Sequence, residues 1–103
     1  MNSIRIFRGD TPTLEFEILD DTGNVVDLTD YVVYFAVKKD DAIIIDKEAS
    51  VFDPTVGLVR VTLTSEETNH IGFALGELEG RHIDGTITTF GQFLVRFLED
   101  VRK

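Results

Sequence analysis

The sequence contains no cysteine, which excludes a disulfide framework, a thiolate metal site and a thiol nucleophile. It has only two histidines, so a centre of several histidines is excluded, and a Ser-His-Asp arrangement must draw on one of these two. No stretch approaches the roughly 20 apolar residues of a membrane-spanning helix, and residues 1–8 lack the apolar core of a signal peptide. We therefore expect synthesis in a reducing cytoplasm, no export signal and no membrane partner.

Basic residues are also scarce. Ten Lys and Arg stand against nineteen Asp and Glu, which gives a formal net charge of −9 at pH 7. The closest basic groups are Lys38-Lys39 and Arg102-Lys103, so no basic stripe offsets the overall sign. Because a phosphate backbone repels such a chain, nucleic acid is not an expected partner.

Apolar residues are plentiful enough for one core. Of the 103 residues, 43% are hydrophobic, 28% are charged and eight are Phe, a composition typical of globular proteins rather than disordered ones. The length suits about one domain, which can bury roughly two-thirds of its unfolded surface. No linker or low-complexity run divides the sequence, so we expect a single domain over residues 1–103.

The stretch at residues 57–68 joins a strand to a short helical turn. Val59, Val61 and Leu63 alternate with polar residues, which is typical of a strand with one buried face. Thr64 can then cap a helical turn, and Glu67 lies three residues further on, the spacing of a capping box. The sequence therefore predicts a strand that leads into one helical turn near 65–70.

Alternation with a period of two recurs along the chain, with turn residues between the alternating segments. It predicts about seven short strands, including those at residues 3–8, 13–19, 31–37 and 42–46. This pattern favours an all-β protein, an antiparallel immunoglobulin-like β-sandwich. We expect its core to include Phe16, Ile18, Phe35, Val59, Val61, Leu63, Phe93 and Val95.

A hairpin is expected in the last third of the chain, because Asp84-Gly85 is a sequence typical of a two-residue type I′ turn. Pairing Ile83 with Thr86 places Phe93 on the core face and leaves apolar residues on the opposite face. The strand at 31–37 is apolar on both faces, so it is either covered on both sides or offers an apolar face to a partner. The apolar residues outside the core then form a possible interface: Val32, Tyr34, Ile83, Phe90 and Leu94.

Other candidate sites have a simpler structural explanation. Arg8-Gly9-Asp10 spells an integrin-recognition tripeptide, but it also reads as a turn that ends the first strand. The acidic groups at 20–24 and 40–46 lack the spacing of a calcium-binding loop. His82 faces the core beside the hairpin turn, and the serines lack a nucleophile-elbow context. The sequence thus predicts no catalytic, cofactor-binding or metal-binding residue and no enzyme activity.

Several segments in order carry a family resemblance: RGDT at 8–11, DTGNVVDLT at 21–29, GLVRVTLTSEET at 57–68 and TTFGQFLV at 88–95. Together they resemble the N-terminal domain of the baseplate upper proteins of phages and prophages of Gram-positive bacteria. The resemblance implies an immunoglobulin-like virion part that docks onto other tail or baseplate proteins, with further copies of itself as a second candidate partner. In longer relatives, segments that trimerise and carry receptor-binding proteins follow this domain.

Two other classes of function remain open. An immunoglobulin-like adhesion module would use Arg8, Gly9 and Asp10 at a cell surface. A small hydrolase or lectin would need convergent polar groups in a pocket, which the sequence does not supply.

Overall fold

The computed structural model describes residues 2–102, and these residues form an all-β fold, as predicted. Among them, no helix is long and apolar enough to cross a membrane. The elements are β1 (Ser3–Phe7), β2 (Thr13–Glu17), β3 (Tyr31–Lys39), β4 (Ala42–Asp53), the 3-10 helix η1 (Pro54–Val56), β5 (Leu58–Thr62), β6 (Gly72–His82) and β7 (Ile87–Leu98).

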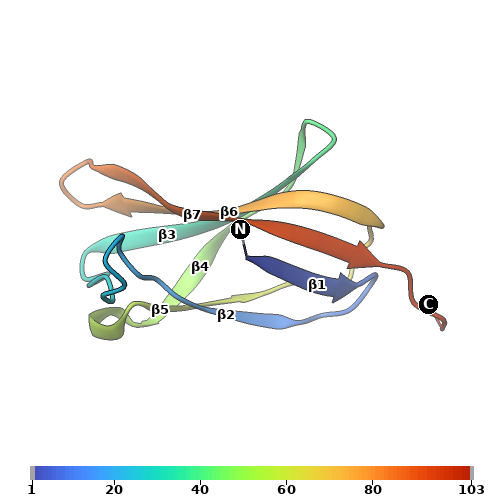
Figure 1. Ribbon diagram of the computed structural model, residues 1–103, viewed down its shortest axis with the longest axis horizontal. Coiled ribbons are helices and arrows are strands. Elements are labelled where there is room, and N and C mark those ends of the chain that lie inside the picture. Colours follow the sequence, from blue (N-terminus) through green and yellow to red (C-terminus); the bar gives the residue numbers. More distant parts are fainter. Residues whose placement is uncertain (1, 103) are drawn as a thin grey trace.

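The seven strands form one curled sheet in the order β1-β7-β6-β3-β4-β5-β2. Figure 1 shows two layers, with β7, β6 and β3 in one and β5 and β2 in the other; β4 runs between them. All the pairs are antiparallel except β1 with β7, which is parallel. The predicted sandwich is confirmed, and the expectation of an antiparallel sheet is corrected for this one pair.

The core lies between the two layers. It contains every residue predicted for it, because inward and outward side chains alternate along each strand. Phe16 is less buried than the other predicted core residues, but it packs against them. Its ring centroid lies 5.4 Å from that of Phe93 and 6.0 Å from that of Phe35. The core also contains other buried side chains, of which Leu28, Leu78 and Phe97 are among the larger ones.

The turn after β5 forms as the capping-box sequence predicts. The Thr64 N–H donates to Glu67 Oε1 at 2.8 Å, and the Glu67 N–H donates to Thr64 Oγ1 at 3.2 Å. The Thr68 N–H then donates to the Thr64 carbonyl, which closes one helical turn. The fully buried Thr68 hydroxyl donates to the Asp10 carbonyl at 2.7 Å and so ties this turn to the loop between β1 and β2.

The β6–β7 hairpin has a different turn from the predicted one. The Gly85 N–H donates to the His82 carbonyl, and the His82 N–H donates to the Thr86 carbonyl, so Ile83, Asp84 and Gly85 form a three-residue loop. Only Gly85 of these residues has a positive φ, 96°, whereas a type I′ turn needs two. The predicted pairing of Ile83 with Thr86 is therefore wrong beside the turn.

The predicted register is nevertheless correct further from the turn. Leu78 lies opposite Gly91, as expected, but Glu79 lies opposite Thr89. Phe90 is thus an extra residue in β7, a β-bulge that shifts the register by one. Two segments also differ from the prediction: the strand expected at 42–46 continues to Asp53, and η1 follows it where a loop was expected.

Candidate functional site

The outer face of the sheet β1-β7-β6-β3-β4 is the side that points away from the core. On β3, Val33, Phe35 and Val37 are buried, so Val32 and Tyr34 point outward. Val32 is 40% exposed, and Tyr34 is half-buried. The apolar second face that the sequence predicts for this strand is therefore partly open to solvent, with Val32 exposed and Tyr34 and Ala36 half-buried.

An apolar and basic patch occupies one end of this outer face. Leu94 of β7 pairs with Leu75 of β6, and Leu75 pairs with Lys38 of β3. In the next row Arg96 pairs with Phe73, and the Arg96 guanidinium lies 5.6 Å from the centre of the Phe73 ring. Phe73 is 60% exposed, which is unusual for a Phe in the middle of a sheet. We call the set Arg5, Lys38, Phe73, Leu75, Leu94 and Arg96 the outer patch.

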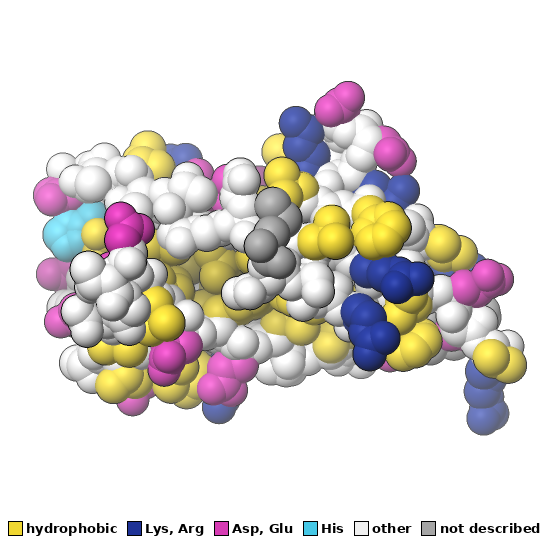
Figure 2. All heavy atoms as spheres, viewed as in Figure 1, with side chains coloured by type: hydrophobic (Ala, Val, Ile, Leu, Met, Phe, Trp, Pro, Cys, Tyr) yellow, Lys and Arg dark blue, Asp and Glu magenta, His cyan; other side chains and the backbone are white. Residues whose placement is uncertain are grey.

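The charge of the outer patch is opposite to that of the protein as a whole. Arg5 of β1 lies beside Arg96 in the parallel pair, and Lys38 stands at the other side of the patch. Figure 2 shows basic and hydrophobic side chains together towards the β1 and β7 end of the molecule. Asp40 and Asp41 line the same depression as Lys38 and the three apolar residues of the outer patch, so the positive charge is concentrated at the Arg5 and Arg96 side. In a chain with a net charge of −9, that side attracts an acidic surface rather than a basic one.

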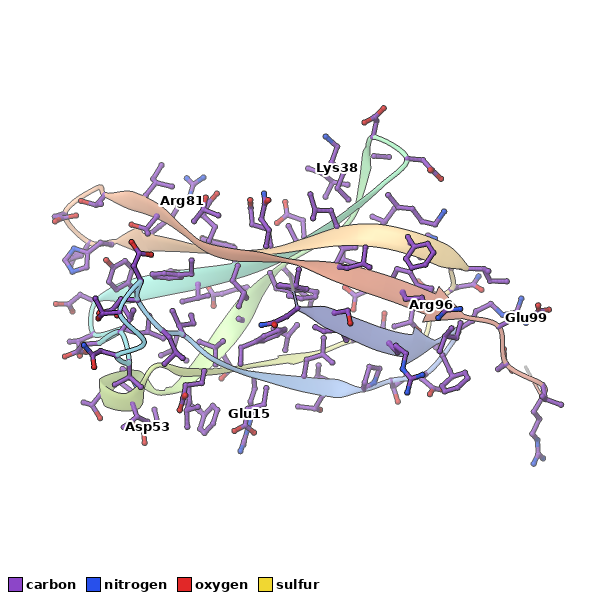
Figure 3. All side chains as sticks on the ribbon, in the orientation of Figure 1. Glu15, Lys38, Asp53, Arg81, Arg96 and Glu99 are labelled. Atoms are coloured by element: carbon purple, nitrogen blue, oxygen red, sulfur yellow. The ribbon has the colours of Figure 1, made fainter. Side chains whose placement is uncertain are left out.

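The other half of the outer face is polar. Arg81 Nε lies 2.7 Å from Glu79 Oε1, and this contact raises the pKa of Arg81. Arg81 also lies over the Tyr34 ring, 5.9 Å from its centre. A shallow depression of about 390 Å³ lies here, lined in part by these three residues. Figure 3 shows Arg81 and Lys38 projecting from the same layer, on the side away from β2 and β5.

The five residues predicted as an interface do not form one cluster. Val32, Tyr34 and Leu94 share the outer face, but the Glu77–Gln92 hydrogen bond lies between Tyr34 and Leu94. Ile83 is 80% exposed in the hairpin loop at the end of the sheet.

Phe90 was expected outside the core, and that expectation is wrong. Its ring lies on the inner side of the sheet, with its centroid 5.5 Å from that of Tyr31, and packs against the core. Gly80 makes room for it, because a Cβ at that position would stand 2.2 Å from the Phe90 ring. The bulge in β7 turns Phe90 to this side, and no period-two count can detect such a shift.

The outer patch also contains residues that the sequence reasoning missed. Phe73 and Leu75 lie on the outward side of β6, which begins at Gly72, and neither was among the residues predicted for an interface. The alternation of large Phe73 and Leu75 with small Ala74 could have indicated that the strand begins before Gly76. The approach of Arg5 to Arg96 depends on the parallel pairing of β1, which no local pattern indicates.

The remaining sequence candidates take part in local structure. Arg8 forms an ion pair with Asp100 at 3.2 Å, and the Asp10 carbonyl accepts the Thr68 hydrogen bond. Asp20 Oδ1 accepts hydrogen bonds from the Thr22 hydroxyl and from two backbone N–H groups, and these bonds lower the pKa of Asp20. Within residues 2–102, no group of three or more potential metal ligands occurs.

His82 lies beside the hairpin loop, partly exposed. Its Nδ1 is 3.0 Å from Asp84 Oδ1, and its ring centroid is 4.8 Å from that of Tyr31. Hydrogen bonds from Thr86, with a smaller contribution from His82, lower the pKa of Asp84. These contacts give His82 a role in the conformation of the loop.

Two solved structures have folds similar to that of this chain. A solved structure described as the N-terminal domain of phage TP901-1 ORF48 is similar, with a TM-score of 0.71, 10% identity, and coverage of 97% of this chain and 86% of that chain. CopC from Methylosinus trichosporium OB3b is also similar, with a TM-score of 0.60, 9% identity, and coverage of 100% and 90%. At these identities the likeness concerns the fold alone.

No curated protein sequence is significantly similar to this one. Residues 1–90, however, match the family described as the BppU N-terminal domain. The chain therefore belongs to the family of N-terminal domains of phage baseplate upper proteins, structural parts of the virion tail that interact with other tail proteins.

Proposed function

We propose that this domain acts in the baseplate by protein–protein docking through its outer patch, without catalysing a reaction. The observation that carries the proposal is the exposed Phe73, surrounded by Leu75, Leu94 and three basic side chains on an otherwise acidic protein. Interfaces combine a central apolar contact with a polar rim, and aromatic residues together with Arg contribute most to their affinity.

The partner is a neighbouring tail protein whose surface carries an apolar centre and an acidic rim. Arg5, Arg96 and Lys38 would face that rim, which orients the two surfaces and speeds association at low salt. The protein is made in the cytoplasm of the host and reaches the virion by this docking step.

The polar half of the outer face is the weaker candidate for the same role. There Arg81 is already paired with Glu79, and Gln92 donates to Glu77. Docking on that half would cost the desolvation of these polar groups. The integrin-type adhesion function gains no support, because Arg8 is paired with Asp100.

The test is co-purification with the tail proteins that are encoded beside this protein, followed by measurement of affinity for the one that binds. Phe73→Asp should keep the fold, since the side chain is largely exposed, and should weaken binding by about 2 kcal/mol, roughly 30-fold. Ile83→Asp is the matched control, because it places the same charge on a more exposed apolar residue outside the patch.

Tyr34→Asp and Leu94→Asp separate the two halves of the outer face. We expect the Leu94 variant to lose affinity and the Tyr34 variant to retain it. If Tyr34→Asp alone weakens binding, docking uses the polar half. If neither variant changes the affinity, docking does not use the outer face.

A further inference from the structure

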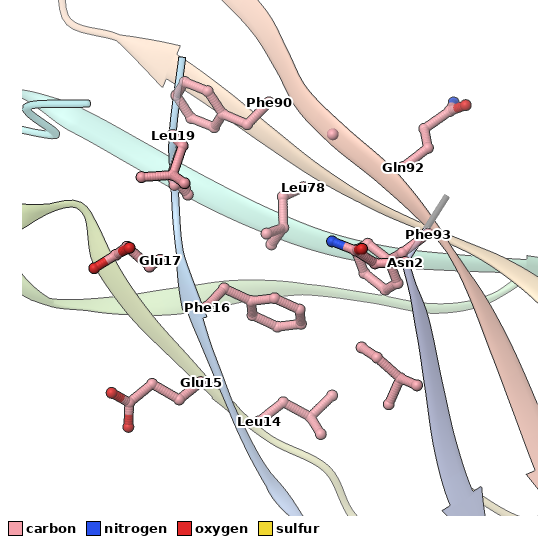
Figure 4. Close-up of a pocket in the computed structure, with 13 residues that line it drawn as sticks. Asn2, Leu14, Glu15, Phe16, Glu17, Leu19, Leu78, Phe90, Gln92 and Phe93 are labelled. Carbon is pink, nitrogen blue, oxygen red and sulfur yellow. The ribbon is translucent and has the colours of Figure 1, made fainter. Parts of the chain in front are cut away.

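A second apolar surface lies between the layers, where the curled sheet does not close. A groove of about 490 Å³ opens between β2 on one side and β1 and β7 on the other. Figure 4 shows Phe16, Leu78, Phe90 and Phe93 around it, with Leu14 at one end. Figure 2 shows the hollow with hydrophobic side chains at its floor.

The groove is bordered by strand edges that have no strand beside them among the described residues. β1 pairs with β7 only from Leu94 to Leu98, which leaves the same edge of β7 open from Ile87 to Phe93. β2 is the last strand of the sheet and pairs with β5 alone. Open edges present backbone N–H and C=O groups to any chain that lies alongside.

One backbone group at the open edge can be identified. The Leu94 N–H donates to the Asn2 carbonyl, so Leu94 directs its backbone groups towards the β1 side. Backbone groups alternate in direction along a strand, and Gln92 is two residues earlier in a regular part of β7. The Gln92 N–H and C=O therefore point to the open edge, in line with the start of β1.

Gly91 leaves room for a side chain from another molecule. It lies opposite Leu78 and lines the groove, and a Cβ built at this position meets no atom within 4 Å. The inner side of the β7 edge is thus empty at the point where the backbone is open.

We propose that this groove accepts one extended strand of a partner protein, which pairs with β7 along Ile87–Phe93 and continues the line of β1. Seven residues of such a strand span about 23 Å. Its inward side chains would be apolar and would pack on Phe16, Phe90 and Phe93. This is strand addition, in which backbone hydrogen bonds give affinity and alternate side chains give specificity.

The charge at the groove identifies the outward side chains of that strand as basic. Glu15 and Glu17 project from β2 away from the groove floor, as Figure 4 shows, so they would stand beside the outward residues of a strand in the groove. Glu15 already pairs with Arg60 of β5 at 3.4 Å, with both side chains half exposed, so Glu17 is the carboxylate that a Lys or Arg of the added strand suits best. A second copy of this chain does not suit these carboxylates, because it brings another net charge of −9. The inference is independent of docking at the outer patch, which lies on the other side of the sheet.

The test uses the whole protein and a fluorescent heptapeptide, acetylated and amidated, in which lysine alternates with valine and phenylalanine. We expect saturable binding that weakens with salt, and at least tenfold weaker binding of a peptide of the same composition without alternation. Hydrogen exchange of the Gln92 amide should slow at least tenfold in the complex. Adsorption without strand pairing would leave that amide unchanged and would overturn the proposal.

Gly91→Val fills the groove from within and should reduce peptide binding at least tenfold, while Ser50→Val adds a similar side chain on an exposed position of β4 and should bind as the parent does. Both variants should melt within a few degrees of the parent protein. Equal binding by Gly91→Val, or no binding by the parent, would overturn the proposal. So would sedimentation showing a parent dimer that Gly91→Val abolishes, since a second copy would then occupy the groove.

Discussion

Replacement of Gly76 by Ala should destabilise the protein far more than one methyl group normally does. Gly76 lies opposite Phe93, and a Cβ at this position would stand 2.1 Å from one atom of the Phe93 ring and 2.7 Å from two others. The ring cannot move away freely, because it is 6% exposed and its centroid lies 5.4 Å from that of Phe16 and 6.0 Å from that of Phe35.

Overpacking of this kind costs about 1–3 kcal/mol, and displacement of the ring from its site would add part of the roughly 3–5 kcal/mol that a Phe→Ala change costs. We therefore expect Gly76→Ala to lose about 3 kcal/mol of unfolding free energy. For a protein of this length, that loss corresponds to a fall in Tm of roughly 12–24 °C.

The measurement is urea unfolding followed by far-UV circular dichroism, with Gly91→Ala as the control. Gly91 is on the same hairpin, but its Cβ would meet nothing within 4 Å, so this variant should stay within about 0.5 kcal/mol of the parent. Equal unfolding midpoints for the two variants would show that Phe93 does not lie over Gly76.

Three further changes test other parts of the structure. Thr68→Val removes the buried hydrogen bond to the Asp10 carbonyl and should cost about 1–3 kcal/mol in urea unfolding, whereas Thr55→Val on the exposed η1 should cost much less. Phe90→Asp should lower the Tm, because the ring packs on Tyr31 and Gly80. An unchanged Tm would show that the Phe90 side chain lies on the outer face of the sheet instead. Burial raises the pKa of Glu67, but hydrogen bonds from Thr64 and Lys47 outweigh it, so the folded pKa lies below the ordinary 4.5. A lowered pKa gives stability that is present above pH 4.5 and lost as pH falls through the folded value, so Glu67→Gln should flatten the acid side of the stability curve. If Glu67→Gln leaves the pH dependence of the unfolding free energy below pH 4.5 unchanged, Glu67 does not contribute to acid stability.

The parts of the fold that depend on local chemistry could be predicted from the sequence. Thr64 and Glu67 form the reciprocal hydrogen bonds of a capping box because their spacing alone brings the groups together. Buried strand faces such as that of Val59 and Val61 follow from alternation, because a strand that buries the other face would expose them.

The parts that depend on distant packing could not be predicted. The parallel position of β1 beside β7 joins residues that are far apart in the chain, and no turn specifies it. The bulge at Phe90 depends on the space above Gly80, which a single strand pattern does not reveal. Of the outer patch only Leu94 was predicted, because the rows of the patch run across β1, β7, β6 and β3 rather than along one strand.

The most direct measurement is the structure of an assembled tail that contains this protein. We predict that Phe73, Leu75 and Leu94 are buried against a neighbouring baseplate protein and that acidic side chains of that neighbour face Arg5 and Arg96. An assembled baseplate in which Phe73 stays exposed to solvent, with the domain held by another surface, would contradict the proposed function.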